Sequence, residues 1–125
     1  MDAERAHHLV MFAIRLAGAI GLTKFARLKA NGKSSVQAFG LHFDSPFGLA
    51  AGFDKNAVAV KALGELGFSH VEIGTVTPLP QAGNDKPRVF RLPKDKALIN
   101  RMGFNNDGVR EIAKRLKEWK EKKGD

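Results

Sequence analysis

Apolar residues recur at helical spacing close to the start of the chain. Asp2 stands where a helix N-cap is expected, and the pattern predicts a helix over about 2–17. Two glycines then interrupt the pattern, so we expect a second short helix over about 22–30, followed by a turn at Asn31-Gly32. The apolar stripe of the first helix contains Leu9, Ala13, Leu16 and Ile20.

This first helix is apolar over much of its circumference, because Val10 and Phe12 add apolar surface beside the stripe. One interpretation is a core helix packed against apolar neighbours on both sides. The other is an interfacial helix with one face in lipid, assisted by the basic residues that follow it. The pattern alone leaves both open. The basic residues are Lys24, Arg27, Lys29 and Lys33.

The middle of the chain has the pattern of a β/α protein. Two short strands are expected within 36–43. Residues 47–52 (FGLAAG) and 71–74 (VEIG) are apolar without alternation, as in strands buried on both faces. Between them, 57–66 has the pattern of a helix that ends at Gly67. A strand, a helix and a strand at this spacing predict one right-handed parallel unit.

The last third of the chain predicts a hairpin-like region and a helix. A loop rich in Pro and Gly is expected over 77–87, with short extended segments at 89–92 and 97–99. Asn106 or Asp107 is expected to cap the final helix. The apolar stripe of that helix consists of Val109, Ile112, Leu116 and Trp119.

Length and composition narrow the possibilities. The chain has 125 residues, whereas a complete β/α barrel needs about 250. The absence of Cys excludes a disulfide scaffold and any thiolate metal site. Because there is also no His-x-x-x-His and no acidic cluster with ligand spacing, no metal site is expected.

The chain is basic, with 21 Lys and Arg against 13 Asp and Glu, a formal net charge of +8. This charge suits an anionic partner such as nucleic acid, a membrane surface or a phosphorylated ligand. The excess is spread along the chain, and the aromatic residues lie in apolar patterns, which argues against a nucleic-acid module. A basic, non-enzymatic module that binds nucleic acid or membrane stays open as the alternative function.

Three clusters of candidate chemistry follow the expected strands, at the end where parallel β/α proteins bind ligands. The first contains Ala51, Gly52 and Lys55. Its small residues let a flat ligand approach the backbone, and a lysine near a flavin pyrimidine stabilises negative charge on the reduced ring. From the residues alone, the simpler interpretation is a surface lysine behind a turn, with Asp54 or Asn56 capping the next helix.

The second and third clusters follow the later extended segments. Thr75, after 71–74, offers a hydroxyl donor and acceptor. Glu72 lies inside the same apolar segment and would need a partner if buried. The third cluster suits a ligand rich in amides and carboxylates, although Asn is also common in turns that lead into helices. It consists of Asn100, Arg101, Met102, Gly103, Phe104, Asn105 and Asn106.

In this order and spacing, the clusters resemble dihydroorotate dehydrogenase, in particular its quinone-dependent, membrane-associated class. The resemblance runs from about Ala38 to Arg110, and DAERAH (2–7) with the apolar helices resembles the N-terminal extension of that class. The strings that carry it are GLAAGFDKN (48–56), VEIGTVTPLPQAGNDKPRVFRLP (71–93) and INRMGFNNDGV (99–109).

The resemblance implies a fold and a reaction. The family has an eight-stranded β/α barrel with FMN at its mouth, and it oxidises dihydroorotate to orotate in pyrimidine synthesis before a quinone reoxidises the flavin. The expected fold class is therefore α/β: a partial (β/α)8 TIM-type barrel, consisting of the first β/α units, preceded by an N-terminal helical extension. The expected division is 1–35 for the membrane and quinone-tunnel extension and 36–125 for the truncated FMN-binding barrel.

The resemblance also assigns roles to single residues. Ala51, Gly52, Lys55 and Thr75 look like flavin contacts, and Lys55 also looks like a substrate contact. The family's catalytic base is a serine on a later strand, beyond Asp125, so no catalytic residue is expected within the chain and the chain alone is expected to be inactive. The substrate-binding string matches Asn100, Arg101, Met102, Gly103 and Phe104, with Asn100 as the best match for a direct amide contact.

The expected partners follow from the same resemblance. They are dihydroorotate and orotate, a quinone, and a membrane surface reached through the N-terminal helices, but not nucleic acid. No signal or transit peptide is seen, so we expect a peripheral location on the cytoplasmic side of the cell membrane.

Overall fold

The computed structural model describes residues 1–26 and 35–123. Its helical elements are α1 (Ala3–Ala19), the short 3₁₀ helix η1 (Leu22–Lys24), α2 (Val60–Leu66) and α3 (Gly108–Lys123). Its strands form two antiparallel hairpins, β1 (Val36–Ala38) with β2 (Leu41–Phe43) and β3 (Val89–Leu92) with β4 (Ala97–Asn100). The described residues therefore form a small α/β structure, and they close no complete barrel.

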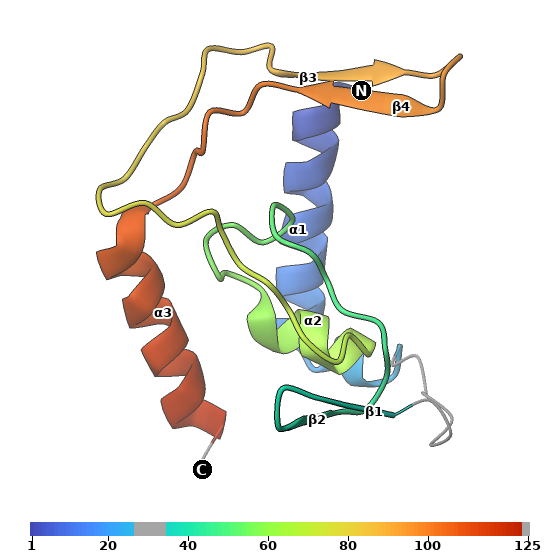
Figure 1. The fold of residues 1–125 in the computed structure, drawn as a ribbon, viewed down its shortest axis with the longest axis vertical. Helices are drawn as coiled ribbons and strands as arrows, with labels where there is room; N and C mark the ends of the chain where they lie inside the picture. The colour runs from blue at the N-terminus through green and yellow to red at the C-terminus, as the bar shows by residue number, and fades with distance from the viewer. Residues whose placement is uncertain (27–34, 124–125) are drawn as a thin grey trace.

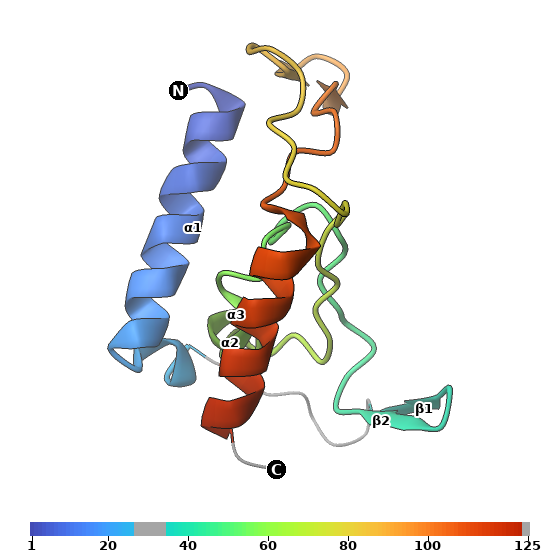
Figure 2. The same cartoon turned by 90° about the vertical axis from the view of Figure 1, so that its left-hand side faces the viewer.

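The two hairpins lie at opposite ends of the molecule. The β3–β4 hairpin lies at the N-terminal end of α1, and the β1–β2 hairpin lies towards the other end (Figure 1). Figure 2 shows the β1–β2 hairpin projecting away from the helices. Its turn has positive φ at Phe39 (55°) and Gly40 (74°), as two-residue hairpin turns require. The two short strands expected within 36–43 are confirmed.

Helix α1 begins as the sequence predicts. The Asp2 carboxylate accepts the backbone N–H of Arg5 at 3.0 Å, which confirms Asp2 as the N-cap and lowers the pKa of its carboxyl. The helix ends at Ala19, two residues beyond the expected bound.

The apolar stripe of α1 does not face the core. Leu9, Leu16 and Ile20 are 57%, 53% and 70% exposed, whereas Met11 is buried and Ile14 packs beside it. The interpretation as a core helix with apolar neighbours on both sides is therefore wrong. One face of α1 packs inward, and the predicted stripe lies on the other.

The second predicted helix is not α-helical over its described part. Of residues 22–26, Leu22–Lys24 forms a single 3₁₀ turn. Residues 25–26 continue as a turn, and the rest of the predicted segment, with the Asn31-Gly32 turn, lies outside the described residues.

The predicted parallel unit is present, but its two extended segments pair over a shorter length than expected. Segments 47–52 and 71–74 pair in parallel, but through the single bridge of Leu49 with Val71. Leu49 N donates to His70 O at 2.9 Å, and Glu72 N donates to Leu49 O at 2.8 Å. Because these segments pair only with each other among the described residues, neither develops into a full strand.

Helix α2, which connects the two segments, begins three residues later than predicted. Ala57 has a φ of 54°, so the chain is still in a turn there. The buried Asp54 carboxylate accepts the N–H groups of Val58 (2.9 Å) and Ala59 (2.7 Å), just before the helix. Asp54 thus shapes the turn ahead of α2 rather than capping its first turn. Gly67, at φ 112°, ends the helix as expected.

Helix α3 is capped by Asn106 and not by Asp107. The Oδ1 atom of Asn106 accepts the N–H groups of Gly108 (2.9 Å) and Thr77 (3.2 Å). Only part of the predicted stripe is buried: Ile112 is 2% exposed, whereas Val109 is 46% exposed. The bond to Thr77 fixes the start of α3 against the loop before β3.

One small core joins α1, α2 and the parallel pair. Three of its residues, Met11, Ala59 and Leu63, are buried. The partly buried residues packed against them are Ile14, Leu49, Phe53, Val58, Phe68 and Val71. Since α1 supplies Met11 and Ile14, the position of this helix depends on the same apolar contacts that hold α2.

The C-terminal end of α1 lies very close to α2. A Cβ placed on Gly18 would come within 2.6 Å of the Ala62 Cβ, so only glycine permits this approach. Next to this contact, the buried Thr23 hydroxyl donates to the Glu65 carboxylate. Helices α1 and α2 are thereby held in one relative position.

Gly18→Ala is expected to lower the free energy of unfolding by about 1–2 kcal/mol, because the added methyl group overpacks the contact with Ala62. The matched control is Gly64→Ala in α2, where a Cβ meets nothing within 4 Å. That substitution is expected to raise stability by about 0.5–1 kcal/mol through helix propensity. Urea denaturation measures both, and a Gly18→Ala protein as stable as the parent would contradict the proposed close contact.

Candidate functional site

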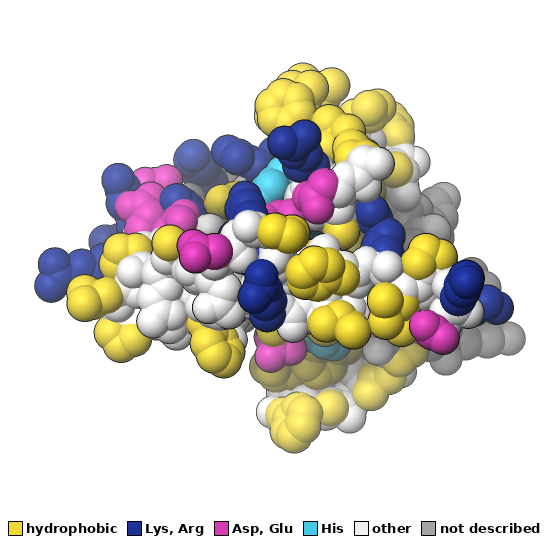
Figure 3. Space-filling model, turned by 90° about the horizontal axis from the view of Figure 1, so that it is seen from above, with side chains coloured by type: hydrophobic (Ala, Val, Ile, Leu, Met, Phe, Trp, Pro, Cys, Tyr) yellow, Lys and Arg dark blue, Asp and Glu magenta, His cyan; other side chains and the backbone are white. Residues whose placement is uncertain are grey.

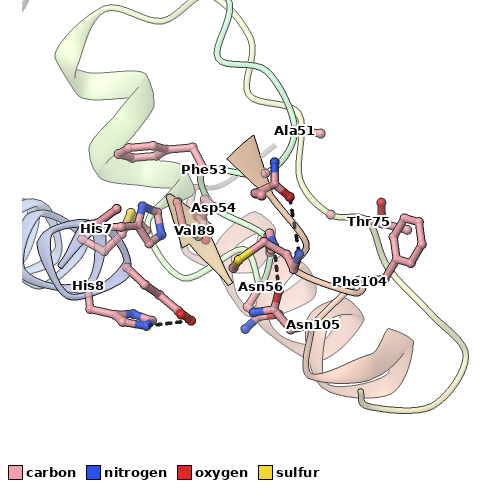
Figure 4. A pocket seen from close by; sticks show the side chains of 18 of the residues that line it. His7, His8, Ala51, Phe53, Asp54, Asn56, Thr75, Val89, Phe104 and Asn105 are labelled. Carbon is pink, nitrogen blue, oxygen red and sulfur yellow. Dashed lines mark hydrogen bonds and ion pairs between the residues drawn. The ribbon is translucent and has the colours of Figure 1, made fainter. Parts of the chain in front are cut away.

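A cavity of about 960 Å³ lies between α1 and the segments that follow the parallel pair. Five parts of the chain contribute to its lining: α1 as far as Arg15, residues 51–58, residues 74–75, residues 84–91, and residues 98–105. Figure 4 shows His7 and His8 of α1 on one side and Thr75 with Phe104 on the other. All nine predicted site residues line this cavity: Ala51, Gly52, Lys55, Thr75, Asn100, Arg101, Met102, Gly103 and Phe104.

The first two clusters are joined through backbone. Gly52 N donates to Gly74 O at 3.0 Å, and both glycines have positive φ (102° and 100°). A side chain would strain the chain at either position. The backbone edges and the exposed Thr75 therefore line this side of the cavity without large side chains between them.

Lys55 faces the third cluster. Its Nζ atom donates to Asn105 Oδ1 at 2.7 Å, and the Asn56 side chain accepts the N–H of Asp107 at 3.0 Å. Lys55 is half-buried, and burial lowers the pKa of its ammonium group, with a smaller contribution in the same direction from Arg88. The simpler interpretation of a free surface lysine is wrong.

The third cluster is held mainly by backbone hydrogen bonds. Arg101 N donates to Arg88 O at 2.8 Å, and the Arg101 guanidinium donates to Pro87 O at 3.0 and 3.3 Å. Arg101 therefore braces its own segment. Asn100 and Phe104 are exposed, and Phe104 takes a positive φ of 55°. These two residues have the side chains most available to a ligand.

The carboxylate of Glu72 has a different setting from the one expected. Glu72 is exposed, so it is not a buried charge in an apolar strand. Its Oε2 atom accepts the N–H of Ala51 at 3.4 Å. Glu72 thus supports the backbone of the first cluster from outside the core.

Sequence reasoning missed the contribution of α1 to the cavity. His7, His8, Met11 and Phe12 all line it, although the histidines carried no recognisable motif. The His7 ring packs edge-on against Phe53, with centroids 5.1 Å apart, and burial lowers the pKa of its imidazole. The sequence did offer one signal: His7 lies one helical turn before Met11, so both residues are on the same side of the predicted helix.

A buried ion pair fastens α1 to this site. Glu4 and Arg88 are each 7% exposed at the side chain, and Arg88 Nη2 lies 2.6 Å from Glu4 Oε1. Arg88 Nε also lies 3.2 Å from both carboxylate oxygens. The hydrogen bonds from Arg88 lower the pKa of the Glu4 carboxyl and raise that of the guanidinium. Lys86 (3.4 Å) and His8 (3.8 Å) lie near the same oxygen.

Comparison with known proteins shows what this arrangement belongs to. The family model of dihydroorotate dehydrogenase matches residues 33–125, about three quarters of the chain. The chain belongs to the dihydroorotate dehydrogenase family. This family is generally flavin-dependent.

The curated relatives are quinone-dependent members of that family. The chain is 58% identical over 119 residues to dihydroorotate dehydrogenase (quinone) of Arthrobacter sp. FB24, covering 94% of this chain and 33% of that protein. It is 55% identical over 116 residues to the Rhodopseudomonas palustris HaA2 protein of the same name, covering 93% of this chain and 30% of that protein. The chain thus spans about a third of the length of the relatives it matches.

Two solved structures from Eimeria tenella have the same fold over these residues. DHODH in complex with ferulenol aligns with a TM-score of 0.82 at 47% identity, covering 94% of this chain and 30% of that one. The ligand-free type aligns with a TM-score of 0.79 at 44% identity, again over 94% of this chain. The described arrangement is therefore that of a dihydroorotate dehydrogenase over the matched third.

The residues around the cavity fit a flavin. Its volume is that of a pocket for a cofactor-sized ligand. Its wall contains unhindered backbone at Gly52, a hydroxyl at Thr75 and a cation at Lys55. These groups match the carbonyl and N–H edge of a flavin ring. The predicted contacts thus lie together, and their assignment to flavin or substrate stays a prediction.

The Glu4 carboxylate makes stability depend on pH in a defined direction. Its pKa in the folded chain lies below its ordinary value of 4.5, so its contribution is complete above that value and is lost as the pH falls through the folded pKa. Glu4→Gln is expected to lower the free energy of unfolding by about 3 kcal/mol at pH 7, because it leaves Arg88 buried without its counter-charge. The difference from the parent should shrink below about pH 4.

Urea denaturation between pH 3 and pH 7 measures this difference. The matched control is Glu111→Gln, since Glu111 pairs with Arg115 at 3.3 Å but is 47% exposed. The control should change stability by less than about 1 kcal/mol at any pH. A Glu4→Gln effect that stays constant down to pH 3 would contradict the assigned charge interaction.

Proposed function

We propose that these residues are the N-terminal third of a quinone-dependent dihydroorotate dehydrogenase, which oxidises dihydroorotate to orotate and passes the electrons to a quinone. The observation that carries the proposal is the convergence of all nine predicted site residues, with the inner face of α1, on one cavity. The names of the relatives at 53–58% identity support the quinone-dependent class.

FMN is the proposed cofactor, and it would supply the acceptor for a hydride from dihydroorotate. Ala51, Gly52 and Thr75 would hold the ring through backbone groups and one hydroxyl. Lys55 would place a cation at the ring edge, oriented by its hydrogen bond to Asn105. Burial lowers the pKa of Lys55, and an anionic partner in the cavity would act in the opposite direction by stabilising its charged form.

Dihydroorotate would bind at the third cluster. The Asn100 amide and the Phe104 ring are exposed at the cavity, whereas Arg101 is occupied with Pro87. We therefore infer that Asn100 contacts the amide groups of the substrate directly, and that Arg101, Met102 and Gly103 mainly shape the backbone around it. The family's base serine matches no position in these residues, so the chain alone is proposed to be inactive.

The proposed fold is the first part of a (β/α)8 TIM-type barrel. The parallel pairing of Leu49 with Val71 around α2 supports two successive β/α units. Residues 1–35 would form the membrane and quinone-tunnel extension and 36–125 the start of the barrel. The core shared by Met11 and Leu63 means that the extension packs directly on the barrel part.

We also propose peripheral attachment to the cytoplasmic side of a cell membrane, and the exposed apolar face of α1 supports the attachment itself. On the face seen in Figure 3, apolar and basic side chains lie next to one another. On α1, the exposed apolar residues include Leu9, Leu16 and Ile20. Such a helix can lie in the headgroup region, where Lys24 favours anionic lipid. Among the described residues, no helix is long and apolar enough to cross a bilayer.

The basic-module alternative gains no specific support. On α3, Arg115 pairs with Asp107 and Glu111, and Lys117 lies 3.9 Å from Glu121. The cations of this helix are thus interleaved with acids, as on a solvated helix face.

The function is tested by joining residues 1–125 to the remaining two thirds of the Arthrobacter relative. This chimera is expected to bind FMN and to oxidise dihydroorotate with a quinone acceptor. Lys55→Ala should lower kcat/KM at least 100-fold, about 3 kcal/mol of lost transition-state stabilisation, whereas Lys61→Ala, at an exposed lysine of α2, should change it less than threefold. A folded, flavin-loaded chimera whose activity is indifferent to Lys55 would contradict the proposal.

The chain alone is expected to show no dye-linked dihydroorotate oxidation and little flavin absorbance after purification. Only part of a flavin site is preorganised by the contacts described above. Turnover by the purified 125-residue chain with bound FMN would overturn the proposed division of the site.

Membrane attachment is tested by flotation with vesicles of mixed neutral and anionic lipid. Leu16→Glu with Ile20→Glu should abolish flotation, because both residues lie on the exposed face of α1. The matched control is Leu98→Glu, at another exposed apolar residue on β4, which should float like the parent. Equal flotation of all three proteins would contradict a membrane role for α1.

A further inference from the structure

Arg88 contacts three separate segments. Through Nε and Nη2 it binds Glu4 of α1, as described above. Through Nη1 it donates to the carbonyl groups of Ala82 (2.8 Å) and Asn84 (3.0 Å). Its own carbonyl accepts the N–H of Arg101 at 2.8 Å. Because a guanidinium is rigid and planar, it fixes the Glu4 carboxylate and the 82–84 carbonyl groups relative to one another.

Asn84 extends these contacts into the third cluster. Its side-chain Nδ2 donates to Arg101 O at 2.7 Å, and its backbone N donates to Met102 O at 3.1 Å. A Cβ on Gly103 would lie 2.8 Å from both Asn84 N and Asn84 Cγ, so the two segments are in close contact.

The 82–84 loop packs closely against the Arg88 guanidinium. Gly83 lies between Ala82 and Asn84, and a Cβ there would come within 2.7 Å of Arg88 Nη1. The φ of Gly83 is 78°, a conformation that other residues adopt with strain. A displacement of the Arg88 guanidinium would therefore move the loop and, through Asn84, the 101–103 backbone.

We propose that Arg88 is a positioning residue that couples the N-terminal end of α1 to residues 101–103. Glu4 holds the guanidinium, the guanidinium holds the 82–84 loop, and Asn84 holds Arg101 and Met102. The coupling means that the placement of α1 sets the geometry of the segment across the cavity. Its relevance to dihydroorotate binding rests on the proposed function, whereas the coupling itself does not.

Hydrogen exchange followed by NMR on the 125-residue chain tests the coupling without flavin, substrate or turnover. In Glu4→Gln, the backbone amides of Asn84 and Arg101 are expected to exchange at least ten times faster, although Glu4 contacts neither. The amide of Leu63, bonded to Ala59 O in the core, is the internal reference for global unfolding, and its exchange should accelerate steeply with added urea. Exchange of the Asn84 and Arg101 amides should instead depend little on low urea concentrations. Glu111→Gln is the matched control and should leave all three unchanged.

A result in which only α1 amides accelerate would overturn the proposal, since Glu4 would then be a simple anchor for the helix. Exchange of Asn84 and Arg101 that rises with urea as steeply as that of Leu63 would also overturn it, because the effect would then be general loss of stability. If Glu4→Gln does not fold, Asn84→Ala tests the coupling in reverse from an exposed position. There the Arg88 Nε–H, which donates to Glu4, should exchange about ten times faster, and an unchanged rate would contradict the coupling.

Discussion

The buried ion pair between Glu4 and Arg88 determines where the N-terminal helix lies. Most of the inward contact of α1 is apolar and non-directional, through Met11 and Ile14. The ion pair adds direction, because a planar guanidinium accepts a carboxylate in few orientations. Both groups are removed from water, so neither can leave the other without a large desolvation cost. The cavity has its second wall because this contact brings α1 over the ends of the parallel segments.

The two walls of the cavity differ in kind. One consists of backbone edges and small or amide side chains, from Gly52, Thr75 and Asn100, which suit a planar polar ligand. The other is the inner side of α1, with Met11 and Phe12 beside His7, and it suits an apolar one. Lys55 lies at the polar wall, held by Asn105. A cavity that joins a polar and an apolar wall is compatible with the proposed binding of a flavin and a quinone in neighbouring positions.

Local chemistry was predictable from the sequence, and long-range contacts were not. The Asp2 cap, the two short strands within 36–43 and the end of α2 at Gly67 depend on neighbouring residues and are confirmed. The extent of the segments at 47–52 and 71–74 depends on pairing partners, so pattern alone predicted longer strands than form. The resemblance named residues that all line one cavity, but it gave no reason to single out Arg88. Its partner Glu4 is 84 positions away, a separation that no periodicity detects.

The close contact of Gly18 with Ala62 is a point about which α1 can tilt, here called the fulcrum. At 1.5 Å per residue, the 14 residues from Gly18 back to Glu4 make a lever of about 21 Å. A tilt of roughly 5° about the fulcrum would displace the Glu4 end by about 2 Å on that lever. Such a displacement is comparable with the length of the hydrogen bonds that Glu4 makes there. A ligand that displaces the middle of α1 would therefore shift the Glu4 end further than the middle itself moves.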